Sequence, residues 1–228
     1  PTNIDFDNTS LRIFDVPAIY EDEQFSQEFQ ANYVGDNLTL VSGLYYFKGD
    51  SCGLFDAILE EAFKAFGGLT REISGCNNSE SYAAYVQGSY DFTEKLSMTL
   101  GGRYTRETKD ATVYTGWYPG FVRDEALIEA QVPKVLDDEE TWSKFNPRVG
   151  LEYQVNDDMM LFTSYSQGFK SGTFNPRATG AEPAVEPETV DSYEVGIKSE
   201  WNDNLRVNAT LFYLNHKDRQ FVSVLPGE

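Results

Sequence analysis

Apolar and polar residues alternate along eight segments of the chain, and these segments come in four pairs joined by short polar turns. In the clearest segment, residues 96–104, Leu96 and Leu100 alternate with Ser97 and Thr99. A period of two places the apolar side chains on one face of a β-strand. The pattern predicts four antiparallel hairpins, formed by residues 24–33 with 38–46, 81–90 with 96–104, 145–153 with 161–169, and 193–201 with 205–213.

Aromatic side chains recur at two heights on the apolar faces of these segments. The set that comes last before the short turns consists of Tyr33, Tyr90, Tyr153 and Trp201. The other set lies eight residues beyond the leucines that open the return segments, and consists of Tyr46, Tyr104, Phe169 and Tyr213. Eight residues of tilted strand rise about 20 Å, close to the apolar band of an outer-membrane barrel. Because both interfaces of a bilayer favour amphipathic rings, we expect lipid to contact these faces.

The connections between the hairpins are long: roughly 35 residues after Tyr46, roughly 40 after Tyr104 and roughly 20 after Phe169. Short turns on one side and long loops on the other are typical of outer-membrane barrels, whose long loops are extracellular. Apolar residues at helical spacing within 55–66 predict a short helix in the first long loop. Residues 1–22 alternate poorly, and we expect a loop there with one short strand near residues 11–14.

Composition limits the class of protein further. The chain has 228 residues, 14% of them aromatic, with a net charge of −19 and no composition break that marks a second domain. The acidic balance argues against nucleic-acid binding. No apolar run reaches about 18 residues, so a β-barrel is the remaining way to span a membrane. Cys52 and Cys76 fall in one loop-like segment and predict a local disulfide in an oxidising compartment; a free pair in the cytosol is the alternative.

Several side chains are candidates for binding, and none for catalysis. The face opposite the rings carries charges that we expect to face the lumen: Glu28, Arg103, Arg148, Glu152, Glu194, Lys198 and Arg206. The second long loop holds candidate ligand contacts that packing between loops explains equally well: Tyr114, Trp117, Tyr118, Phe121 and Arg123. The acidic run 137–140 lacks the glycine-punctuated spacing of a calcium loop and favours a solvated surface; a divalent-cation site is the alternative. With no nucleophile, nucleotide or zinc motif, we expect neither an enzyme nor a bound cofactor or metal.

Several motifs, taken in order, resemble the barrel of TonB-dependent outer-membrane receptors. The resemblance covers roughly residues 24 to 216. Its residues are Ala84-Tyr85-Val86-Gln87, Leu100-Gly101-Gly102-Arg103-Tyr104-Thr105, Phe145-Asn146-Pro147-Arg148-Val149-Gly150, Tyr165-Ser166-Gln167-Gly168-Phe169-Lys170-Ser171-Gly172, Glu186-Pro187-Glu188, and Ser192-Tyr193-Glu194-Val195-Gly196-Ile197-Lys198.

This resemblance implies an all-β, antiparallel transmembrane barrel of about 22 strands, filled by an N-terminal plug domain. Such a receptor lies in the outer membrane of Gram-negative bacteria, in contact with lipid and lipopolysaccharide. It imports scarce ligands, most often ferric siderophores, with energy passed through the TonB complex.

We find no plug, no TonB-contacting segment and no closing C-terminal strand. Residues 1–228 therefore resemble an internal part of one barrel domain, with about 8 to 10 of its strands. A passive porin, an adhesin barrel and a secreted carbohydrate-binding β-sandwich are the alternatives.

Overall fold

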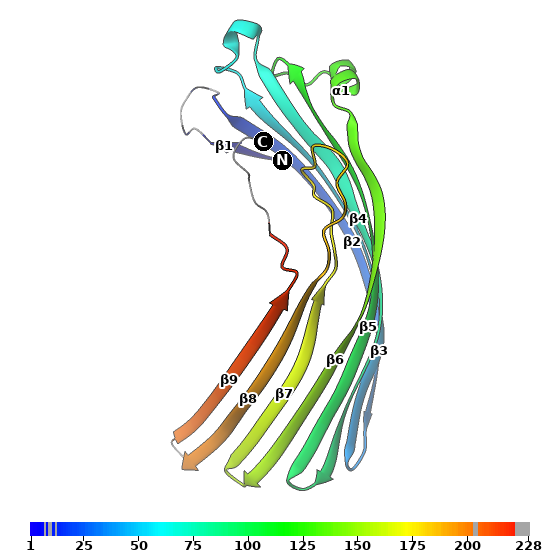
Figure 1. Cartoon of the computed structure of the whole chain (residues 1–228), viewed down its shortest axis with the longest axis vertical. Helices are drawn as coiled ribbons and strands as arrows, with labels where there is room; N and C mark the ends of the chain where they lie inside the picture. Colours follow the sequence, from blue (N-terminus) through cyan, green and yellow to red (C-terminus); the bar gives the residue numbers. More distant parts are fainter. Residues whose placement is uncertain (7, 9–10, 12, 203–204, 222–228) are drawn as a thin grey trace.

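The structure is a computed structural model that describes residues 1–6, 8, 11, 13–202 and 205–221. It forms a single antiparallel sheet in which every strand pairs with its neighbours in the sequence (Figure 1). The strands are β1 Thr2–Asp5, β2 Asp15–Val34, β3 Leu38–Leu59, β4 Leu69–Thr93, β5 Leu96–Pro119, β6 Lys134–Asn156, β7 Met159–Lys170, β8 Glu188–Asn202 and β9 Leu205–Lys217, with a 3-10 helix η1 at Lys64–Phe66 and a helix α1 at Glu125–Gln131.

This arrangement confirms the predicted all-β antiparallel fold and its number of strands. All four predicted hairpins are present, although residues 203–204 of the last turn lie outside the described part of the chain. The described residues contain no second sheet, so the β-sandwich alternative is wrong. No helix among them is long and apolar enough to cross a membrane.

Cross-strand register divides the sheet into two faces, because directly opposed residues in a ladder point the same way. We call the face that carries the leucines and rings the outer face. One of its rows crosses seven strands and consists of Leu38, Tyr90, Met98, Leu151, Thr163, Val195 and Leu211. Leu100, Val195 and Leu211 on this face are 52%, 54% and 77% exposed. The sheet therefore does not use its leucines to build a protein core.

Rings also meet across neighbouring strands of the outer face. The Tyr165 and Tyr193 ring centroids lie 5.0 Å apart, and those of Tyr193 and Tyr213 lie 6.3 Å apart. Tyr46 and Tyr82 form a similar contact at 5.0 Å. Amphipathic rings side by side at one height are the arrangement that a membrane interface favours.

Strands β2 to β6 are much longer than their alternating segments. They contain 20, 22, 25, 24 and 23 residues, whereas β7 to β9 contain 12, 15 and 13. A tilted strand needs only about 9–11 residues to cross a bilayer. The predicted long structureless loops are therefore wrong for the first two connections, because β3 to β6 continue through most of them. The actual connections are residues 60–68, 120–133 and 171–187.

Two local predictions are also wrong. Residues 55–59 continue strand β3, and only the short η1 follows, so the predicted helix in the first connection is absent; α1 lies in the second connection. At the N-terminus, residues 1–22 are not a loop, because β1 pairs with the start of β2, which begins at Asp15. The short strand predicted near residues 11–14 is absent at residues 11, 13 and 14, and residue 12 lies outside the described part of the chain. In each case a neighbouring strand completes the backbone hydrogen bonds, which overrides the local pattern.

A buried apolar cluster lies on the other face of the sheet, which we call the inner face. Phe174 and Ala178 pack there against Ala111, Val113 and Leu136 of β5 and β6. These two residues belong to the connection 171–187, here called the inner segment, which lies on the concave side of the sheet (Figure 1). Lys109 Nζ donates to the Gly172 carbonyl at 3.0 Å, and Ser171 Oγ donates to Glu107 at 2.7 Å. The inner segment is therefore fixed to the sheet by packing and by hydrogen bonds.

An arginine placed on the outer face tests which face meets lipid. In the protein reconstituted in lipid vesicles, Leu100→Arg should lower the free energy of unfolding by about 2–4 kcal/mol, because a charge near the bilayer midplane is costly. Gln87→Arg lies at nearly the same depth on the inner face and should change it by less than about 0.5 kcal/mol. Equal effects of the two variants, measured by urea titration, would contradict the assignment of faces.

Candidate functional site

Beyond the aromatic rings, a disulfide joins the long strands β3 and β4. Cys52 and Cys76 are directly opposed in the ladder, with their Cα atoms 4.1 Å apart, and the disulfide bond closes between them as predicted. The glycines Gly53 and Gly75 form the next opposed pair. The bond therefore holds together two strands that extend past the part of the sheet that a bilayer needs.

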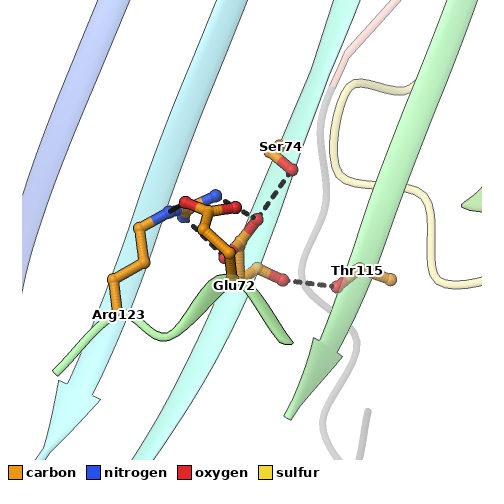
Figure 2. Close-up of polar contacts among 5 residues, drawn as sticks. Glu72, Ser74, Thr115 and Arg123 are labelled. Atoms are coloured by element: carbon orange, nitrogen blue, oxygen red, sulfur yellow. Dashed lines mark hydrogen bonds and ion pairs between the residues drawn. The ribbon is translucent and has the colours of Figure 1, made fainter. Parts of the chain in front are cut away.

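A buried polar cluster lies near the far ends of β3, β4 and β5 (Figure 2). Glu72 of β4 is only 1% exposed. Arg123 donates from Nη1 to its Oε2 at 2.7 Å, Ser74 Oγ donates to Oε1 at 3.0 Å, and Thr115 Oγ1 donates to its backbone carbonyl at 3.1 Å. A buried carboxylate needs such partners, because leaving it unpaired costs several kcal/mol, about 3–5 when the partner is removed.

The connection 120–133 covers this cluster, and Arg123 belongs to it. Asp124 caps the N-terminus of α1 by accepting a hydrogen bond from the Ala126 amide at 3.0 Å. After α1 the chain returns so close to β5 that a Cβ on Gly116 would lie 2.1 Å from the Gln131 carbonyl oxygen. Only glycine admits this approach. We call the connection 120–133 the apical cap.

A second carboxyl group lies in the same cluster without a full set of partners. Asp56 of β3 is directly opposed to Glu72 and is 7% exposed, and its Oδ1 is buried without a hydrogen bond. Burial, together with the nearby Glu72 carboxylate, raises the pKa of Asp56 to about 6, and Arg123 opposes that rise. The cluster thus holds the Asp56 and Glu72 carboxyl groups and one guanidinium, and of these two carboxyl groups Glu72 is the one that forms an ion pair with Arg123.

The five predicted ligand contacts lie in or beside the apical cap, and they point in different directions. Tyr118 is 1% exposed, and Arg123 is engaged with Glu72 and with Glu125. Phe121 packs on Gly68, where a Cβ would lie 3.1 Å from its ring. Tyr114 is partly exposed on the same side of β5 as Tyr118. Trp117 shares the inner face of β5 with Val113 and lies 5.7 Å from the Arg71 guanidinium.

All seven charged residues predicted to face the lumen lie on the inner face, together with the inner segment. Four of them interact with an aromatic side chain or with a carboxylate. Tyr85 donates to Glu28 at 2.6 Å, and the Arg103 guanidinium lies 5.3 Å from the Tyr45 ring centroid. Arg206 pairs with Glu200, and the Lys198 ammonium lies 5.4 Å from the Phe162 ring. The remaining members are Arg148, Glu152 and Glu194.

Hollows between described residues occur on both faces of the sheet. Two of them, of about 670 and 480 Å³, lie between side chains of the outer face such as Leu44, Tyr82, Val195 and Leu211. A smaller cavity of about 210 Å³ lies between β2 to β5 and Pro176–Arg177 of the inner segment.

The sequence profile of one family, described as TonB dependent receptor-like, beta-barrel, matches residues 1–227. The chain belongs to the TonB-dependent receptor family. Members of this family are outer-membrane β-barrels that act as transport receptors and not as enzymes. The family resemblance found in the sequence is thereby confirmed.

Individual relatives of this TonB-dependent receptor chain are distant. The metal-pseudopaline receptor CntO of Pseudomonas aeruginosa is 29% identical over 148 residues, which are 65% of this chain and 19% of that protein. The ferric yersiniabactin uptake receptor FyuA of Yersinia pestis matches 91% of this chain and 30% of its own, with a TM-score of 0.77 and 19% identity. The siderophore receptor PiuA of Acinetobacter baumannii matches 87% of this chain over 32% of its own length, with a TM-score of 0.61 and 15% identity. The chain thus spans about a fifth to a third of these relatives.

In the polar cluster under the apical cap, sequence reasoning named Arg123 but missed Asp56 and Glu72. Asp56 lies in the predicted helix 55–66 and Glu72 in a segment that reads as loop, and no spacing rule pairs them. Asp56 and Glu72 become cross-strand partners only through the register of the extended strands β3 and β4. The acidic run 137–140 lies on β6, where Asp137 accepts from Lys134 at 2.7 Å. The described residues contain no group of three or more potential metal ligands.

Asp56 makes the attachment of the apical cap dependent on pH. Because its folded pKa is raised from 3.8 to about 6, its stabilising contribution is complete below about pH 4 and is lost as pH rises through 6. Asp56→Asn should therefore protect amides 120–133 more strongly than wild type at pH 8, by at most about 3 kcal/mol, and equally at pH 4. Hydrogen exchange, corrected for intrinsic rates, measures the difference.

Asp36→Asn, at the exposed turn between β2 and β3, removes the same charge far from the cap and should change nothing. A cap that opens more readily in Asp56→Asn at pH 8 would show that Arg123 stabilises the ionised Asp56, and would contradict this account.

Proposed function

We propose that this chain is part of a receptor that imports a scarce ligand, a ferric siderophore, across the outer membrane of a Gram-negative bacterium. The match of the family profile to residues 1–227 carries this proposal. The names of three relatives support the cargo class: a metal-pseudopaline receptor, a ferric yersiniabactin uptake receptor and a siderophore receptor. The receptor performs no chemistry on its ligand; it captures the ligand and admits it with energy from TonB.

In the proposed barrel the inner face lines the lumen. The charged residues on it are solvated there or contact the plug domain, because a lumen tolerates both signs of charge and a lipid face does not. Arg103, Arg148 and Glu152 lie at the level of the alternating segments and would contact the plug. The outer face contacts membrane lipid and lipopolysaccharide through its leucines and rings.

The ends that carry the apical cap and the inner segment are extracellular in this proposal. Short turns at residues 35–37 and 94–95 join the strands at the other end, and barrels of this kind have short periplasmic turns. If the strand extensions are extracellular, Trp117 lies on the inner face along the path of an arriving ligand. Tyr114 and Phe121 lie farther from that path, and Tyr118 and Arg123 support the cap.

Uptake of radiolabelled ferric chelates tests this function. Deleting the gene of the complete receptor should abolish saturable uptake of at least one chelate, and deleting TonB should abolish it equally. Complementation with the receptor gene should restore uptake only when TonB is present. Uptake that rises linearly with concentration and persists without TonB would instead support a passive porin, and binding of cells without any uptake would support an adhesin.

A further inference from the structure

The cavity under the inner segment has a floor without side chains. Gly53 and Gly75 are directly opposed on β3 and β4, next to the disulfide. A Cβ on Gly75 would lie 2.0 Å from the Thr112 carbonyl oxygen, so this position accepts only glycine. A Cβ on Gly53 would meet the Tyr20 ring at 3.4 Å, an ordinary contact. The two glycines therefore leave a hollow in a wall that the disulfide holds in place.

The roof of the cavity is a turn with fixed anchors on both sides. Phe174 and Ala178 are buried against β5 and β6, on either side of Pro176 and Arg177. Within the turn, the Arg177 amide donates to Asn175 Oδ1 at 3.0 Å. The roof thus holds its place over the glycines, and the site does not have to be built when a ligand arrives.

Arg177 gives the cavity an unneutralised cation. Its guanidinium lies 5.4 Å from the centroid of the Phe55 ring, which also lines the cavity. Within the described part of the chain it forms no ion pair, although the whole chain carries a net charge of −19. A guanidinium has five donors and binds carboxylate and related oxygen anions in a bidentate manner.

The other walls are partly apolar and partly polar. Ile73 and Val113 supply apolar surface, and Asn77 adds a polar amide. Ser51 also lines the cavity, and its hydroxyl donates to Asp22 at 2.5 Å, which places one carboxylate at the edge. With about 210 Å³, the cavity is smaller than the roughly 300–1,000 Å³ of whole-ligand sites. It therefore accommodates one arm of a larger ligand.

We propose that the cavity between the Gly53–Gly75 floor and the Pro176–Arg177 roof binds an anionic arm of the transported ligand, with a carboxylate or catecholate oxygen on the Arg177 guanidinium and its apolar part against Phe55. This inference rests on the proposed function, since it assigns part of the cargo site. It also specifies the cargo: the receptor prefers anionic chelates over neutral ones despite its acidic surface.

Binding of two defined chelates to the complete, detergent-purified receptor tests the inference. The probes are an anionic ferric tris-catecholate and a neutral ferric trihydroxamate. Wild type should bind the anionic chelate more tightly. Arg177→Gln should weaken that binding by about 10- to 100-fold, the effect of losing hydrogen bonds to a charged group, and leave the neutral chelate unchanged. Gly53→Leu should weaken it similarly by filling the hollow.

Two matched variants separate local recognition from net charge. Lys48→Gln removes one positive charge from the outer face and should leave both affinities unchanged. Asp22→Asn removes the carboxylate at the cavity edge and should strengthen binding of the anionic chelate. Heat-modifiable migration on gels confirms that each variant has folded as a barrel.

The outcomes distinguish this inference from the proposed function. If wild type binds a chelate and Arg177→Gln binds the anionic chelate equally well, the inference is wrong and the proposed function stands. If wild type binds neither chelate at any accessible concentration, the siderophore assignment fails and the inference fails with it. A preference for the neutral chelate would also overturn the inference.

Discussion

The constraint on which this structure depends is the absence of water inside a bilayer. Every backbone amide and carbonyl in that layer must find a protein partner, and an antiparallel sheet that closes on itself provides one for each. Alternation along each strand then separates two environments with a single layer of backbone. Leu211 and Glu194 lie on adjacent strands, yet one faces the side suited to lipid and the other the side suited to water. The two-residue period, the rings at two heights and the turn lengths all follow from this constraint.

Beyond the alternating segments, the same strands are stabilised by other interactions. Both faces of the extended parts of β2 to β6 carry polar residues, and stability there comes from local devices and not from lipid. A disulfide links β3 to β4, the apical cap buries the Glu72–Arg123 pair, and Phe174 anchors the inner segment. These contacts fix the connections to the sheet, and in the proposed receptor such fixed surfaces would present a formed site to a dilute ligand.

The parts of the fold that the sequence predicted are those governed by neighbouring residues. Alternation around Leu96 or Val195, the turns between paired strands and the Cys52–Cys76 disulfide needed no knowledge of distant contacts. The strand extensions were not predicted because they carry polar residues on both faces, such as Ser79 on the inner face and Thr108 on the outer face. Their sequence therefore shows no alternation of apolar and polar residues. The helical spacing of apolar residues within 55–66 predicted a helix that is absent, because pairing of β3 with β4 outweighs the weak local preference for a helix.

The candidate sites were harder to predict than the fold. Aromatic and basic residues near 114–123 were recognised as unusual, yet whether each supports the cap or faces the lumen depends on register and on the position of the cap. Asp56 and Arg177 gave no signal, because a buried carboxyl or an unpaired guanidinium is defined by its surroundings. The Gly53–Gly75 floor became visible only once the two glycines were known to be opposed.

The most direct test of the central claim compares two adjacent residues of β8 in lipid. A nitroxide attached at Val195→Cys should collide preferentially with lipid-soluble oxygen, and one attached at Glu194→Cys with a water-soluble nickel chelate. The native cysteines are joined in a disulfide and do not take the label. Equal accessibility of both positions to the nickel chelate, or a reversed preference, would show that the leucine-bearing face does not contact lipid.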